Sequence, residues 1–148
     1  MKLNSLLLFA CSAFMFAGCS SSNQGAALTV ENAPEYIQPL EEGVLNASYQ
    51  GNTVTFRLYP NSNKGKLFSS DISGKCTVTV KYMIGVFVWS DPYTVTDVAF
   101  TYKAGGTEGE YKQADYLEAS FTKDVGLEYT GVNVYNLNVT EITGHMQA

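Results

Sequence analysis

Residues 45–58 read LNASYQGNTVTFRL, and this stretch determines the class of fold that the sequence predicts. Apolar and polar side chains alternate on both sides of Gly51-Asn52. A period of two is typical of a half-buried strand, because successive side chains of a strand point to opposite faces. Glycine accepts the positive φ of a tight turn, so a Gly-Asn pair between two such runs predicts a β-hairpin. The alternating apolar residues are Leu45, Ala47, Tyr49, Val54, Phe56 and Leu58.

The same period of two returns further along the chain. Two later runs alternate in this way, and each predicts a strand with one buried face. Between them, Val86–Trp89 is apolar at every position, which favours a strand covered on both faces or a bulged continuation of the preceding strand. The alternating residues are Cys76, Val78, Val80 and Tyr82 in the first run and Val98, Phe100 and Tyr102 in the second.

Two C-terminal stretches are less regular. Tyr111–Phe121 fits a strand and also one face of a helix, and the strand is favoured because its neighbours are all strands. In Gly131–Thr143 the apolar positions change phase, so a bulge near Tyr135-Asn136 is needed to keep one face buried. About six to eight short strands then predict an all-β domain. We expect a single antiparallel β-sandwich, immunoglobulin-like or transthyretin-like, or a small barrel.

The segments between the predicted strands include two long connections. Glu31–Glu42 contains Pro34 and Pro39, which disfavour a helix interior, so this segment predicts an extended or turn-like lead-in. Asn61–Gly74 is rich in Ser, Asn, Lys and Gly and predicts a loop. Three apolar side chains are expected to anchor that loop: Leu67, Phe68 and Ile72.

The N-terminus has the zones of a secretory signal. Lys2 is followed by the apolar run Leu6–Phe16, which is too short to span a membrane as a helix, and then by two small residues. Phe16-Ala17-Gly18-Cys19 resembles the lipobox of bacterial lipoproteins. The resemblance implies that the signal is cut just before Cys19, that this thiol carries diacylglycerol and that the new amino group is acylated. Several acyl chains together give stable membrane anchoring.

This resemblance divides the chain into a signal peptide (1–18), a lipidated flexible tether (19–28) and a β-domain (29–148). Ser20–Ala27 holds no apolar side chain larger than alanine, so it buries too little surface to order itself. The serine after Cys19 resembles the outer-membrane sorting signal of Gram-negative lipoproteins. It implies a lipid-anchored position on the outer membrane, facing the periplasm.

Charge and cysteine content agree with this position. The formal net charge is −5, which provides no basic surface for nucleic acid and is repelled by anionic lipids, so the membrane contact is expected through the lipid on Cys19. Cys11 leaves with the signal and Cys19 is modified, so Cys76 remains alone and no intramolecular disulfide is expected. Cys76 begins a predicted strand, where it is expected to act as a buried apolar residue.

The sequence has few candidates for catalysis, and we expect neither an enzyme nor a cofactor or metal. Its one histidine, His145, lies near the C-terminus, where we expect frayed chain. Glu41-Glu42 and Glu108/Glu110 are close acidic pairs, but both lie in loop-like sequence that favours solvated charge. Asn61–Gly65 lacks the acidic ligands of a calcium loop. The enzymatic alternative is a carboxylate-dependent glycan hydrolase.

Aromatic residues suggest where the protein binds a partner. Trp89 and Tyr93 place two large rings around a turn, and exposed rings there would form a patch for an unknown envelope protein or for peptidoglycan. The alternative is that these rings only cover the core. The sequence therefore predicts a lipid-anchored binding or structural module of the cell envelope.

One further resemblance concerns Thr53–Tyr59, followed by Leu67-Phe68 and Asp71. This stretch is similar to a strand and loop of the small outer-membrane lipoprotein of type VI secretion complexes. The resemblance implies a transthyretin-like sandwich that docks an inner-membrane partner, and it gives a component of an envelope secretion complex as an alternative function.

Overall fold

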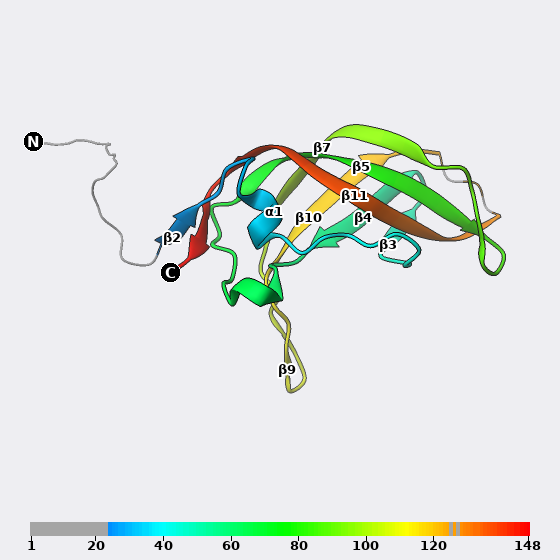
Figure 1. Ribbon diagram of the computed structural model, residues 1–148. Coiled ribbons are helices and arrows are strands. Elements are labelled where there is room, and N and C mark those ends of the chain that lie inside the picture. The colour runs from blue at the N-terminus through cyan, green and yellow to red at the C-terminus, as the bar shows by residue number, and fades with distance from the viewer. Residues whose placement is uncertain (1–23, 125, 127) are drawn as a thin grey trace, which may run out of the picture.

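The structure is a computed structural model that describes residues 24–124, 126 and 128–148, and its regular structure is almost entirely β (Figure 1). The helical elements are the single turn α1 (Ala33–Tyr36) and the 3-10 turn η1 (Ser62–Lys64). No helix in the described part of the chain is long and apolar enough to cross a membrane. The strands are β2 (Gln24–Ala27), β3 (Ala47–Gln50), β4 (Thr53–Leu58), β5 (Ser73–Ile84), β6 (Val88–Trp89), β7 (Tyr93–Lys103), β8 (Thr107–Glu108), β9 (Tyr111–Lys112), β10 (Tyr116–Thr122), β11 (Tyr129–Thr143) and β12 (His145–Gln147).

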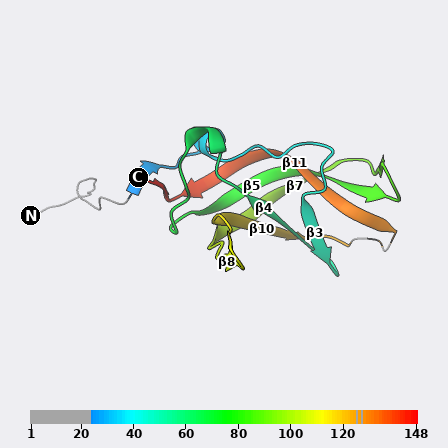
Figure 2. The same ribbon diagram turned by 90° about the horizontal axis from the view of Figure 1, so that it is seen from below.

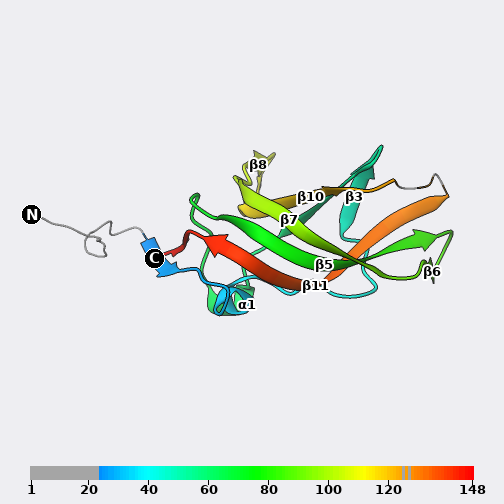
Figure 3. The same ribbon diagram turned by 90° about the horizontal axis from the view of Figure 1, so that it is seen from above.

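Six antiparallel strands close into a barrel in the order β11-β3-β4-β10-β7-β5, and β5 pairs with β11 to complete it. The all-β prediction is confirmed, and of its two architectures the small barrel is the one adopted. The short strand β6 extends β5 beyond the barrel, whereas β2 with β12 and β8 with β9 form separate two-stranded sheets. Figure 3 shows β2 and the C-terminus at one end of the molecule and β6 at the other.

The hairpin predicted from residues 45–58 is confirmed. β3 pairs with β4 from Ala47↔Phe56 to Gln50↔Thr53, and Gly51 has the positive φ of 61° that the tight turn needs. The alternation of the other runs is also correct, because their apolar residues fill the barrel. Phe56 and Phe100 are each 1% exposed, and burying such a side chain contributes roughly 1.5–3 kcal/mol.

The predicted bulge in the last run is confirmed as well. The pairing of β11 with β5 shifts register between Tyr135 and Asn138. Within this irregularity Asn136 has a positive φ of 55°, a conformation that asparagine tolerates better than most residues. Val132 and Val139 are therefore both buried, although they lie on opposite phases of the sequence pattern.

The prediction for Val86–Trp89 is wrong. Val86 and Phe87 lie in the loop between β5 and β6, and they are 71% and 85% exposed. The physical reason is that Gly85 and Phe87 both have positive φ, which reverses the chain where β5 has already left the barrel. An apolar run thus forms an exposed hairpin instead of a covered strand.

Residues 24–27, predicted to belong to a flexible tether, instead form β2. This strand pairs with β12, and the Leu28 N–H continues the contact by donating to the Gly144 C=O at 2.9 Å. The order comes from main-chain hydrogen bonds to the end of the chain and not from apolar side chains in the segment itself. The expectation of a frayed C-terminus at His145 is corrected by the same pairing.

The two long connections differ from expectation in detail. Residues 33–36 form the turn α1, and Pro34 sits in its first turn, where a missing N–H costs nothing. In the loop after β4, Phe68 and Ile72 are buried as predicted, but Leu67 is 51% exposed.

Candidate functional site

An exposed hairpin of apolar residues marks one end of the molecule. Residues 84–89, called the apolar hairpin below, join β5 to β6, and Ile84 pairs with Val88 across the loop. Val88 is 55% exposed, and Val86 and Phe87 are exposed further still. No residue from 82 to 90 carries a charge. Contiguous exposed apolar surface of this kind is typical of an interaction site.

The backbone of the apolar hairpin is fixed in a strained form. Phe87 has a φ of 65°, and the left-handed region costs a residue with a Cβ roughly 1–2 kcal/mol. The Gly85 C=O accepts a hydrogen bond from Thr130 Oγ1 at 2.9 Å, which ties the loop to β11. The fold therefore holds an aromatic side chain in solvent at an energetic cost, and strain of this kind clusters at functional positions.

Four tyrosines form a cluster next to the apolar hairpin, since Tyr82 precedes it on β5 and Tyr129 pairs with Ile84. Tyr82 stacks on Tyr129 with ring centroids 4.7 Å apart and on Tyr93 at 6.0 Å. The hydroxyls of Tyr82 and Tyr93 are 2.7 Å apart, and Tyr49 donates its hydroxyl to the Tyr129 C=O at 2.6 Å. Burial raises the pKa of both Tyr82 and Tyr93, and the hydrogen bond with Tyr82 raises the pKa of Tyr93 further. We call these four residues the tyrosine stack.

The structure does not bring the two predicted patch residues together. Tyr93 pairs with Val80 of β5, which is buried. Trp89 pairs with Met83, three residues further along β5. Paired residues share a face and successive residues alternate, so Trp89 lies on the outer face and Tyr93 on the core side. Both rings are half-buried. Sequence reasoning missed Val86 and Phe87, although Gly85 and the absence of charge were usable signals.

The apolar hairpin lies far from the N-terminal strand. β11 begins at Tyr129 beside Ile84 and ends at Thr143, next to β12 and β2. Its 15 residues span about 50 Å at ~3.3 Å per residue. In Figure 1 β2 lies at the left end of the molecule and the β5–β6 loop at the right end. A partner that contacts the apolar hairpin is therefore remote from whatever holds the N-terminus.

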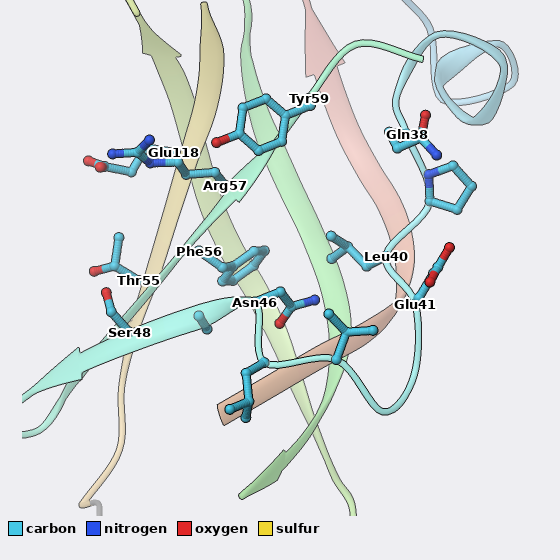
Figure 4. Close-up of a pocket in the computed structure, with 14 residues that line it drawn as sticks. Gln38, Leu40, Glu41, Asn46, Ser48, Thr55, Phe56, Arg57, Tyr59 and Glu118 are labelled. Atoms are coloured by element: carbon cyan, nitrogen blue, oxygen red, sulfur yellow. The ribbon is translucent and has the colours of Figure 1, made fainter. Parts of the chain in front are cut away.

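A second surface is a groove of about 750 Å³ between residues 38–46 and the β3–β4 hairpin (Figure 4). β3 pairs with β11 only at Ala47↔Val132 and then diverges from it (Figure 2). The groove opens on the other side of Ala47, because the Asn46 N–H donates to the Val132 C=O at 3.2 Å and residues 41–46 follow β11 instead of β4. The groove is lined by Gln38, Pro39, Leu40, Glu41, Val44, Leu45, Asn46, Ala47, Ser48, Thr55, Phe56, Arg57, Tyr59 and Glu118.

Two asparagines hold residues 41–46 against β11 and so keep the groove in shape. The Asn46 side chain exchanges two hydrogen bonds of 2.8 Å with the main chain of Val134. Asn133, which is fully buried, accepts from the Gly43 N–H at 2.7 Å and donates to the carbonyl oxygens of Glu41 and Val44. These side chains replace the strand pairing that β3 does not provide.

Aromatic rings and one arginine occupy the upper wall of the groove. The Arg57 guanidinium lies 4.1 Å from the centre of the Tyr116 ring, and that ring lies 6.1 Å from Tyr59. A hydrogen bond with Tyr59 raises the pKa of Arg57. Arg57 makes no ion pair with any residue in the described ranges. Glu41 and Glu118 lie on opposite walls, and Figure 4 shows Glu118 pointing away from Glu41.

The other candidate chemical groups are engaged or covered. Cys76 is fully buried, and burial raises the pKa of its thiol to about 12. Glu42 is paired with Lys81 at 2.6 Å, and His145 Nδ1 lies 2.8 Å from the Asp71 carboxylate. Within the described residues, no cluster of three His, Cys, Asp or Glu side chains is arranged to hold a metal ion.

Comparisons with known proteins add no relative to this description: no family model, no curated protein and no solved structure matches the chain. The proposed lipidation residue Cys19 lies outside the described residues.

Proposed function

We propose that this chain is a lipid-anchored binding module of the bacterial cell envelope. Diacylglycerol on Cys19 holds it to the outer membrane, and the barrel presents a docking element toward the periplasm. The proposal is supported at the N-terminus by the lipobox pattern of Phe16–Cys19. It is supported in the folded part by the apolar hairpin.

The apolar hairpin is the observation that carries the proposal. Phe87 is 85% exposed on a loop that the hydrogen bond from Thr130 ties to β11, which suits an anchor residue that enters a pocket of a partner. A loop whose backbone is already ordered loses less conformational entropy on binding. The partner we propose is a protein with an apolar pocket, acting at a distance from the anchoring membrane.

A membrane is a poorer occupant for this surface. Residues 82–90 contain no lysine or arginine to attract anionic headgroups, and the protein as a whole is acidic. The hairpin also lies at the opposite end of the 15-residue strand β11 from β2, the strand that follows the proposed lipid in the chain. These two features favour a protein partner over insertion into the anchoring bilayer.

Binding without catalysis is the second part of the proposal. The groove carboxylates Glu41 and Glu118 do not converge on one point, which disfavours the paired acid and base of a glycan hydrolase. The Cys76 thiol is buried and protonated at neutral pH, so it is unsuited to nucleophilic attack.

The test uses epitope-tagged full-length protein, purified from crosslinked cells. Phe87→Ser should abolish recovery of a partner identified by mass spectrometry, because the anchor side chain is lost. Tyr111→Ser is the matched control, since Tyr111 is an equally exposed aromatic residue (83%) on the β8–β9 hairpin. Equal recovery with wild type and Phe87→Ser would contradict the docking role.

A further inference from the structure

The groove described above has the chemistry of a ligand site, and it is independent of the apolar hairpin. One wall is aliphatic, with Leu40 and Val44. The other is the outer face of β3 and β4, with Ser48 and Thr55 (Figure 4). A ligand that fits must present both an apolar group and several hydrogen-bonding groups.

A main-chain acceptor lies along the groove. Main-chain groups of residues two apart on a strand point to the same side, so the Arg57 C=O points the same way as the Tyr59 C=O, which accepts from the Gln38 N–H at 2.8 Å. Asn46, the residue opposite Arg57, instead donates its N–H to the Val132 C=O at 3.2 Å. The Arg57 C=O thus lacks its strand donor and faces the groove, where it suits an amide N–H of a ligand.

Ring stacking is available at the same place. Tyr59 is 39% exposed, and its ring lies beside that of Tyr116, on which the Arg57 guanidinium rests. Tyrosine rings present an apolar face and a polar edge, which suits the face of a sugar ring and its hydroxyls.

The groove continues along the β3–β4 hairpin and is therefore longer than one ring. A second hollow shares Ser48 and Thr55 with it and is otherwise lined by Tyr49, Gln50 and Thr53. The continuation is rich in hydroxyl and amide groups. A linear ligand with repeated hydroxyls matches this track.

Charge selects among such ligands. Among the described residues, Arg57 is the one cationic side chain that lines the groove, and Glu41 and Glu118 line it too. One cation beside two carboxylates does not favour a polyanion. A neutral chain is the better match.

We propose that this groove binds a neutral glycan chain of N-acetylated amino sugars. The acetamido N–H donates to the Arg57 C=O, the acetyl methyl contacts the aliphatic wall of Leu40 and Val44, and a sugar ring stacks on Tyr59. Neighbouring rings extend along Ser48 and Thr55. Chain length and N-acetylation together therefore determine binding.

The test measures binding of the full-length protein in detergent to the hexasaccharide of N-acetylglucosamine by titration calorimetry. Cellohexaose, which lacks the acetamido group, should bind at least tenfold more weakly. Tyr59→Ala should weaken binding at least tenfold. Tyr111→Ala, at an exposed tyrosine that does not line the groove, should leave binding unchanged. Val44→Trp places a larger side chain in the groove and should also weaken binding. This second variant does not remove a buried side chain.

Three results would overturn the proposal. The first is no detectable heat with the hexasaccharide at millimolar concentration. The second is equal affinity for cellohexaose, which would remove the role of the acetamido group. The third is wild-type affinity for the hexasaccharide in both Tyr59→Ala and Val44→Trp, with melting temperatures equal to that of the wild type. A Phe87→Ser variant should bind the glycan normally, so failure here is distinguishable from failure of the hairpin proposal.

Discussion

The side chain of Asn46 pairs with the main chain of Val134 as a residue of a neighbouring strand would. Its carbonyl oxygen accepts from the Val134 N–H at 2.8 Å, and its amide donates to the Val134 C=O at 2.8 Å. This pair lies where β3 and β11 separate, so one asparagine side chain continues the barrel wall across the gap. The groove opens on the β4 side of this contact, because residues 41–46 follow β11 and separate from β4.

Removing this side chain should destabilise the barrel. Asn46→Ala leaves the Val134 N–H without its acceptor and the Val134 C=O with only the 3.5 Å contact from Asn133 Nδ2, and an unpaired buried polar group costs roughly 1–3 kcal/mol. We expect a fall of that size in the free energy of unfolding, measured in urea. Asn63→Ala is the control, because this exposed residue of η1 is involved only through its main-chain N–H. Equal stability of the two variants would show that the pairing is not structural.

Relieving the strain at Phe87 should stabilise the protein. Phe87→Gly removes the penalty of a φ of 65° and should raise the free energy of unfolding by about 1 kcal/mol. The same substitution at Val86, which has no positive φ, should not stabilise. A Phe87→Gly variant less stable than wild type would mean that the aromatic side chain packs in the fold and is not held out for a partner.

Much of the fold is predictable because the alternation of apolar and polar residues in a strand depends only on residues close together in the sequence. Val54, Phe56 and Leu58 identify their buried face, and the phase change at Asn136 reveals the bulge. The prediction for Val86 and Phe87 is wrong because an apolar run has the same pattern in a covered strand and in an exposed hairpin. Only the tertiary path of β5 beyond the barrel distinguishes the two. The groove was missed because Asn46 acts through a partner far along the chain, which no local pattern encodes.

The start of the folded domain can be tested by truncation. A chain that begins at Leu28 lacks β2, so β12 loses its strand partner and the contacts near His145 lose support. We expect a chain that begins at Gln24 to be more stable by ~1–3 kcal/mol, because several main-chain hydrogen bonds of about 1 kcal/mol each are kept. Identical melting temperatures would support the shorter domain that the sequence predicted.

Alkaline pH should destabilise the tyrosine stack. Tyr82 and Tyr93 have folded-state pKa values above the ordinary value of 10.0, so the folded state keeps protons that the unfolded state releases. Their contribution to stability is complete below pH 10 and is lost as pH rises above it. Tyr93→Phe should reduce the slope of stability against pH in that range by one proton. Cys76→Ala removes another group with a raised pKa, whose contribution to stability is lost as pH rises above 9.0.

The thiol of Cys76 should report unfolding. At pH 8 a pKa of about 12 in place of 9.0 lowers the thiolate fraction about a thousandfold, and the side chain is fully buried as well. We expect no reaction with maleimide in the native protein and rapid reaction in guanidinium. Labelling of the native protein at the denatured rate would contradict the buried position.

The lipid anchor has its own test. Cys19→Ala should give a soluble or unprocessed protein, because the diacylglycerol has no thiol to join. Cell fractionation detects a soluble product, and intact mass measurement detects an unprocessed one. A variant that still fractionates with membranes and migrates like wild type would remove the lipoprotein interpretation while leaving the groove and hairpin proposals standing.

The central claim is that the apolar hairpin docks a protein partner, and site-specific photocrosslinking in living cells tests it most directly. A photoreactive phenylalanine analogue replaces Phe87 in one strain and Tyr111 in another. We predict a discrete protein adduct from position 87 and none from position 111. Adducts of equal yield at both positions, or an adduct at position 87 only to lipid, would contradict the claim.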